Sequence, residues 1–116
     1  MNKRDKIILL KIGEEAAALT KMLHGADESA FLANDEKMRA TCMTLINIGE
    51  LVKKLTLEFR ESNHVVPWKD IAGFRDVAAH GYFTLRMADV WIFATTELPV
   101  FTAQIKEMLS EGGGNA

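Results

Sequence analysis

The spacing of apolar residues along two long stretches is the strongest constraint on how this chain can fold. Apolar side chains recur every three or four residues over residues 38–59, and the same spacing returns over residues 87–108. Residues three or four apart lie on one face of an α-helix, and helices in a bundle pack along such stripes. The pattern therefore predicts an all-α fold, an antiparallel up-and-down bundle of four main helices with short links.

Capping residues, glycines and prolines predict where these helices begin and end. Gly25 is a natural stop for the first helix, and Asn34 is a suitable N-cap for the second. Between them, a connector over residues 27–33 is expected to contact the core through Phe31 and Leu32. Pro99 lacks an amide hydrogen, so a kink or break is expected around residues 95–96 of the last helix. The four helices are expected over residues 4–23, from 34 to 62 or 63, from 67 or 68 to 81, and from 85 onward.

Size and charge limit the chain to one small domain. Of its 116 residues 48% are apolar, so we expect a single domain over residues 1–111 and a flexible glycine-rich tail over residues 112–116. A lone cysteine, Cys42, excludes a fold held by intramolecular disulfides. The net charge of −2 excludes a uniformly basic surface of the kind that binds nucleic acid strongly. An anion-binding site must therefore be local, or be assembled from more than one chain.

No segment of the sequence resembles a membrane span or a secretion signal. The apolar run over residues 7–10 follows basic residues, but charged residues end it after four positions. A signal core needs about seven apolar residues and a membrane span about 20. We therefore expect a cytoplasmic protein that does not contact the membrane.

A polar cluster over residues 75–82 is not required by helix packing. Asp76 and His80 are four residues apart, so they share a helix face on which the carboxylate can orient the imidazole. Arg75 and His80 point about 140° apart on a straight helix. They could converge if the helix ends at His80 or if a second copy of the chain faces the first. On spacing alone, solvated surface residues and local ion pairs remain an open interpretation.

The cluster resembles a known family signature. The string Arg75-x4-His80-x-Tyr82 is similar to the R-x4-H-x-Y motif of HEPN-domain proteins, specifically the HepT-type toxins. Residues 48–55 resemble the "IGEAAKRL"-type stretch of that family's second helix, and residues 67–75 resemble its "PWxxIxGxR" segment. The similarity therefore extends over most of the chain in the expected order.

This resemblance implies a fold, an activity and partners. Family members are helical bundles that pair as homodimers, with the two motifs facing each other in a cleft. They are metal-independent ribonucleases and toxins of two-gene toxin–antitoxin modules. The antitoxin is a minimal nucleotidyltransferase (MNT) that transfers AMP to the motif tyrosine, which is Tyr82 here. The implied partners are a second copy of the chain, the nucleotidyltransferase and an RNA substrate, and no cofactor is implied.

The same resemblance suggests catalytic roles for three residues. His80 would act as general base or acid when an RNA 2′-hydroxyl attacks the adjacent phosphate, since the unperturbed pKa of an imidazole, about 6.5, is close to the working pH. Arg75 would bind the phosphate and stabilise the charge that develops on it. Asp76 would orient His80. Tyr82 would accept AMP. The alternative is that Tyr82 only contacts RNA or caps the end of the helix.

Other polar residues leave alternatives open. Glu50 interrupts an apolar stretch, and it either pairs with Arg75 or faces solvent near Lys53 and Lys54. The three histidines share no zinc-binding spacing, so no metal site is expected. Two rival functions also stay open: a catalytically silent HEPN subunit that binds substrate for a nucleotidyltransferase, and a plain interaction bundle.

Overall fold

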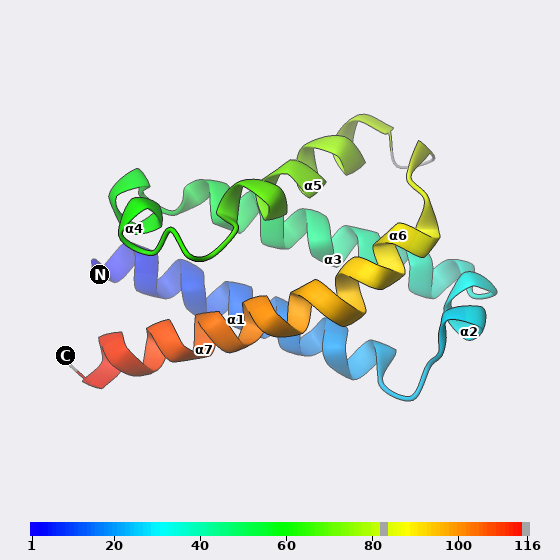
Figure 1. Ribbon diagram of the computed structural model, residues 1–116, viewed down its shortest axis with the longest axis horizontal. Coiled ribbons are helices and arrows are strands. Elements are labelled where there is room, and N and C mark those ends of the chain that lie inside the picture. The colour runs from blue at the N-terminus through cyan, green and yellow to red at the C-terminus, as the bar shows by residue number, and fades with distance from the viewer. Residues whose placement is uncertain (82–83, 115–116) are drawn as a thin grey trace.

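The computed structural model describes residues 1–81 and 84–114, with side chains up to residue 111, as an elongated helical bundle (Figure 1). Its elements are α1 (Lys3–Leu23), α2 (Glu28–Leu32), α3 (Asp35–Lys54), α4 (Leu57–Ser62), α5 (Trp68–Gly81), α6 (Met87–Ile92), the π-helical segment η2 (Phe93–Glu97) and α7 (Leu98–Gly114). The chain runs back and forth along the long axis, so the start of α1 and the end of α7 lie at one end of the bundle. The described residues contain no strand, and the all-α bundle is confirmed.

Side chains from α1, α3 and α7 form the centre of the bundle. The fully buried residues include Leu9, Ile12 and Leu19 of α1, Ile48 and Val52 of α3, and Leu98 and Ile105 of α7. These positions belong to the apolar stripes that the sequence shows, so burial of the stripes stabilises the antiparallel arrangement. No helix in the described ranges is long and apolar enough to cross a membrane.

The first helix ends where the sequence predicts. The Asn2 side chain accepts a hydrogen bond from the Asp5 amide at 2.7 Å and caps the start of α1. Gly25 has a φ of 80°, a left-handed conformation that glycine adopts without a steric cost. The following connector is partly helical, since Asp27 caps the short helix α2. Phe31 is fully buried as expected, but Leu32 is 42% exposed, so its predicted role as an anchor was wrong.

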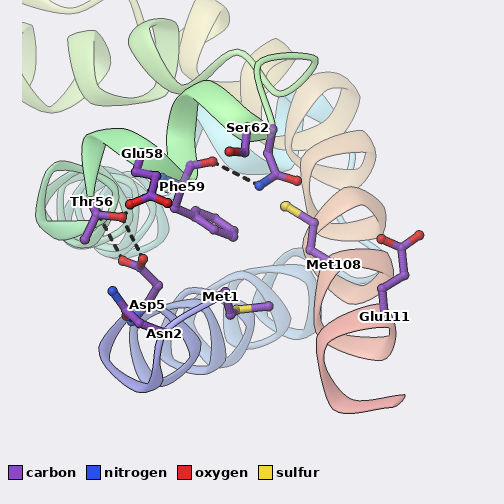
Figure 2. A pocket seen from close by; sticks show the side chains of 10 residues that line it. Met1, Asn2, Asp5, Thr56, Glu58, Phe59, Ser62, Met108 and Glu111 are labelled. Atoms are coloured by element: carbon purple, nitrogen blue, oxygen red, sulfur yellow. Dashed lines mark hydrogen bonds between the residues drawn. The ribbon is translucent and has the colours of Figure 1, made fainter. Parts of the chain in front are cut away.

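The second predicted helix is interrupted, which corrects its expected end at residue 62 or 63. α3 ends at Lys54, and Leu55 is extended before α4 begins. A buried carboxylate explains the break: Asp5 of α1 accepts hydrogen bonds from the Thr56 amide at 2.9 Å and from the Thr56 hydroxyl at 2.7 Å (Figure 2). The same hydroxyl accepts from the Phe59 amide and caps α4. This contact between distant segments overrides the local helical pattern.

The last helix changes its winding at the predicted place. The π-helical segment η2 covers Phe93–Glu97, which includes residues 95–96, and α7 follows directly. Pro99 cannot donate an amide hydrogen bond, so the carbonyl one turn earlier loses its α-helical partner. A single π-helical turn inserted in an α-helix is one of the recognised forms of such an irregularity. α7 extends to Gly114 and so reaches into the stretch expected as a tail.

Three contacts hold α5, which carries the polar cluster. At its start, the Trp68 ring packs against Phe59 and Phe101, with centroid distances of 6.0 and 5.8 Å. In its middle, the Phe74 ring stacks on Phe93 of η2 at 5.6 Å. Along its length, α5 lies on α3, with Ile71 buried between them. The polar cluster is therefore presented from a helix fixed on two sides.

Candidate functional site at the junction of α3 and α5

Gly49 sets the distance between α3 and α5 at the candidate site. A Cβ atom at this position would collide with the Cβ of Arg75 and would lie 3.2 Å from the carbonyl oxygen of Ile71. Only a residue without a side chain lets the two helices approach this closely. The close approach brings Glu50, the next residue of α3, alongside Arg75.

Two carboxylates hold the Arg75 guanidinium. Its Nη2 atom lies 2.8 Å from Oε1 of Glu50, and its Nη1 atom donates to Oδ1 of Asp76 at 3.2 Å. The Arg75 side chain is 29% exposed, so it is only partly accessible to solvent. Of the two alternatives for Glu50, the structure therefore has the ion pair with Arg75.

Asp76 contacts cations rather than the histidine. Its Oδ1 atom accepts a hydrogen bond from Nζ of Lys53 at 2.8 Å, in addition to the bond from Arg75. The Lys53 hydrogen bond, assisted by Arg75, holds the pKa of the Asp76 carboxyl below its ordinary value of 3.8. Within residues 1–81 and 84–114, no hydrogen bond joins Asp76 to His80. Among the described residues, the partners of the Asp76 carboxylate are therefore Lys53 and Arg75.

His80 lies exposed near the end of α5. It borders an open hollow with Asp76, Val77, Gly81 and Thr84, and Val77 is itself 56% exposed. The Thr84 hydroxyl donates to the carbonyl of Gly81, the last residue of α5, at 2.6 Å. The side chain of His80 forms no hydrogen bond or ion pair with any other described residue. Its ring is therefore available to a ligand. Tyr82 lies outside the described residues.

Arg75 and His80 do not converge within one chain. α5 stays helical to Gly81, so the alternative in which the helix ends at His80 does not apply. Arg75 points toward α3, while His80 borders the open hollow. Within the described residues of one chain, Arg75 and His80 therefore face different parts of the surface.

A second pocket lies at the opposite end of the bundle, between the start of α1, the α4 segment and the end of α7 (Figure 2). Asp5, Glu58 and Glu111 line it, and its described lining includes no lysine, arginine or histidine. An acidic pocket repels phosphate, which makes it unsuitable for RNA. Across the described ranges, no group of three or more histidine, cysteine, aspartate or glutamate side chains is placed to hold a metal ion.

Two residues of the site were not identified from the sequence. From the sequence, Lys53 is only a candidate for positive charge near the site or for solvated surface, and Gly49 is only part of the stretch over residues 48–55 that resembles the family's second helix. Glu50 and Lys53 are three apart on α3, so their shared face was available from spacing. That this face meets Arg75 and Asp76 depends on the register of α3 against α5, which spacing within one helix does not define.

Comparison with known proteins identifies the protein family to which this chain belongs. The family model for HepT-like proteins, described as "Ribonuclease HepT-like", matches residues 12–108. This match covers most of the chain, including every residue of the site at the α3–α5 junction. The chain belongs to the HepT-like family, which confirms the family resemblance and supports a ribonuclease function.

Curated relatives agree with this assignment over nearly their full lengths. "Putative RNase TTE0752" of Caldanaerobacter subterraneus subsp. tengcongensis is 36% identical over 94% of this chain and 97% of its own length. "Putative RNase MJ1216" of Methanocaldococcus jannaschii is 30% identical, over 96% and 93% respectively. "Probable ribonuclease HepT" of Thermococcus cleftensis is 22% identical, over 93% and 98%. No solved structure gives a significant match.

Proposed function

We propose that this chain is a metal-independent RNA endonuclease whose catalytic site is completed by a second copy of the chain. One observation carries the proposal. Arg75 is held in place by two carboxylates, while His80, five residues later, is exposed and makes no bond within the described chain. A fixed guanidinium and a free imidazole are what cleavage at a phosphate needs, and membership of the HepT-like family supports RNA as the substrate.

The chemistry assigns each group a role. The RNA 2′-hydroxyl attacks the adjacent phosphorus, the bond to the leaving 5′-oxygen breaks, and a cyclic phosphate forms. His80 accepts the hydroxyl proton or donates one to the leaving oxygen. Arg75 contacts the phosphate oxygens and stabilises their growing charge. Glu50 and Asp76 orient Arg75, so less conformational freedom is lost when the phosphate arrives.

A homodimer supplies the geometry that one chain lacks. In a two-fold pair, the Arg75 of one copy can lie opposite the His80 of the other. The exposed Val77 side chain beside His80 gives this face of α5 an apolar contact to bury. Pairing also brings the Arg75 guanidinium of each chain to one site, so phosphate can be bound locally despite the net charge of −2 per chain.

Mixing two inactive variants tests whether the site is shared. Arg75→Ala and His80→Ala should each be inactive alone. Refolded together in equal amounts, they should recover about a quarter of wild-type cleavage, because half of the dimers are mixed and each of these has one intact site. Mixtures as inactive as the single variants would show that both groups must come from the same chain.

We further propose that the enzyme is the toxin of a toxin–antitoxin module and that a nucleotidyltransferase antitoxin attaches AMP to Tyr82. Tyr82 directly follows the helix that carries Arg75 and His80, so an AMP group there would place negative charge beside the phosphate site and repel RNA. Incubation with the nucleotidyltransferase and ATP should add the mass of AMP to the wild type but not to Tyr82→Phe. Equal labelling of both proteins would contradict this assignment.

A further inference from the structure

We propose that Lys53 is a positioning residue for the reaction and that it acts on Arg75 through Asp76. This inference rests on the proposed ribonuclease function, in which Arg75 contacts the phosphate. It concerns a lysine of α3 that the family motif on α5 does not include.

The contacts form one continuous array across the α3–α5 junction. Lys53 donates from Nζ to Oδ1 of Asp76 at 2.8 Å, and the same oxygen accepts from Nη1 of Arg75 at 3.2 Å. On its other side, the guanidinium pairs with Glu50 at 2.8 Å. Positive and negative groups therefore alternate through four residues, with Lys53 at one end and Glu50 at the other.

The Arg75 guanidinium depends on this array for its orientation. Its Nε atom is buried and has no hydrogen-bond partner among the described residues, so only the two Nη atoms are anchored. One of these anchors is Asp76, whose side chain is 49% exposed and free to adopt other rotamers. Lys53 binds the carboxylate oxygen that contacts Arg75, so it holds Asp76 in the rotamer that orients the guanidinium.

Lys54 provides a matched comparison on the same helix end. It is adjacent to Lys53, it is exposed, and it carries the same charge, but it makes no hydrogen bond or ion pair with a described residue. Neutralising Lys54 therefore removes the same amount of positive charge from this region without disturbing Asp76.

The test compares kcat/KM for RNA cleavage among single and double variants. Lys53→Ala should lower kcat/KM about fivefold, a loss typical of one partly exposed ion pair in a network. Lys53→Arg should restore most of it, because a guanidinium can still donate to Asp76. Lys54→Ala should remain at the wild-type value. In an Asp76→Asn background, Lys53→Ala should cause no further loss, because the path to Arg75 is already broken.

A different pattern would overturn the inference. If Lys53→Ala keeps its full effect in the Asp76→Asn background and also lowers the salt dependence of binding, Lys53 contacts RNA phosphate directly. If Lys53→Ala cleaves like the wild type while Arg75→Ala is inactive, Lys53 has no positioning role but the ribonuclease stands. If the wild type itself cleaves no RNA, the proposed function fails and the inference fails with it.

Discussion

Nη2 of Arg75 and Oε1 of Glu50 lie 2.8 Å apart, across the point where α5 passes over Gly49 of α3. This ion pair joins the residue expected to bind phosphate to the neighbouring helix of the bundle. The same contact explains why the candidate site lies between two helices rather than on α5 alone.

Removing the charge of Glu50 should affect cleavage more than stability. Glu50→Gln should lower kcat/KM about tenfold, because the guanidinium loses one of its two charged anchors. The free energy of unfolding should change by less than about 1 kcal/mol, since the pair is partly solvated. Glu107→Gln, at an exposed position of α7, is the control for charge removal and should match the wild type in both measurements. Equal kcat/KM in all three proteins would refute the anchoring role.

Two glycines in helices should respond in opposite ways to alanine. Gly49→Ala should lower the free energy of unfolding by about 1–3 kcal/mol, because the new Cβ collides with Arg75 and forces the helices apart. The Cβ added by Gly73→Ala would meet no atom within 4 Å. This variant should therefore be neutral, or more stable by up to about 1 kcal/mol because alanine has the higher helix propensity. Urea unfolding at one protein concentration measures both. Similar values for the two variants would contradict the close packing at Gly49.

The buried carboxylate at the other end of the bundle should be important for stability alone. Asp5→Ala leaves the Thr56 amide without its acceptor and disrupts the cap of α4, so it should cost about 2 kcal/mol. Asp70→Ala, at an exposed position of α5, should cost much less. The comparison is made by measuring the melting temperatures of the two variants in thermal unfolding. An Asp5 variant as stable as the Asp70 variant would show that the break after α3 has another cause.

Acid should remove the contribution of Asp76 to stability. The Lys53 hydrogen bond, with Arg75, holds the pKa of this carboxyl below 3.8 in the folded chain, so folding favours the charged form. Its stabilising effect is therefore present above that pH and is lost as the pH falls through the lowered pKa. Asp76→Asn should unfold at lower urea than the wild type at neutral pH, and the difference should disappear in strong acid. A difference that persists there would mean that charge is not its origin.

The elements that the sequence predicts well are those determined by local signals. The apolar stripe of α1, the stop at Gly25 and the irregular winding before Pro99 each depend on residues within one or two turns. The predicted continuation of α3 failed because Asp5, about 50 residues earlier in the chain, binds Thr56. Periodicity within one segment contains no information on such a contact.

In the candidate site too, features within one helix were predicted from the sequence, whereas contacts between helices were not. Arg75 and His80 were identified by motif, and their divergence on α5 was predicted from helix geometry. The hydrogen bond of Asp76 with Lys53 of α3 was not predicted, because spacing within α5 considers only residues of that helix. Which groups meet across two helices depends on their relative register, and here Gly49 sets how closely the helices approach.

Cleavage of RNA in the presence of a chelator tests the central claim most directly. Purified wild type, in excess EDTA, should cut an RNA oligonucleotide but leave unchanged the same sequence with 2′-deoxyriboses, because the attacking hydroxyl is missing. His80→Ala and Arg75→Ala should each reduce cleavage by at least about 100-fold, whereas His24→Ala, at an exposed position outside the motif, should cleave like the wild type. Cleavage that is abolished by EDTA, or that survives in His80→Ala, would contradict the account.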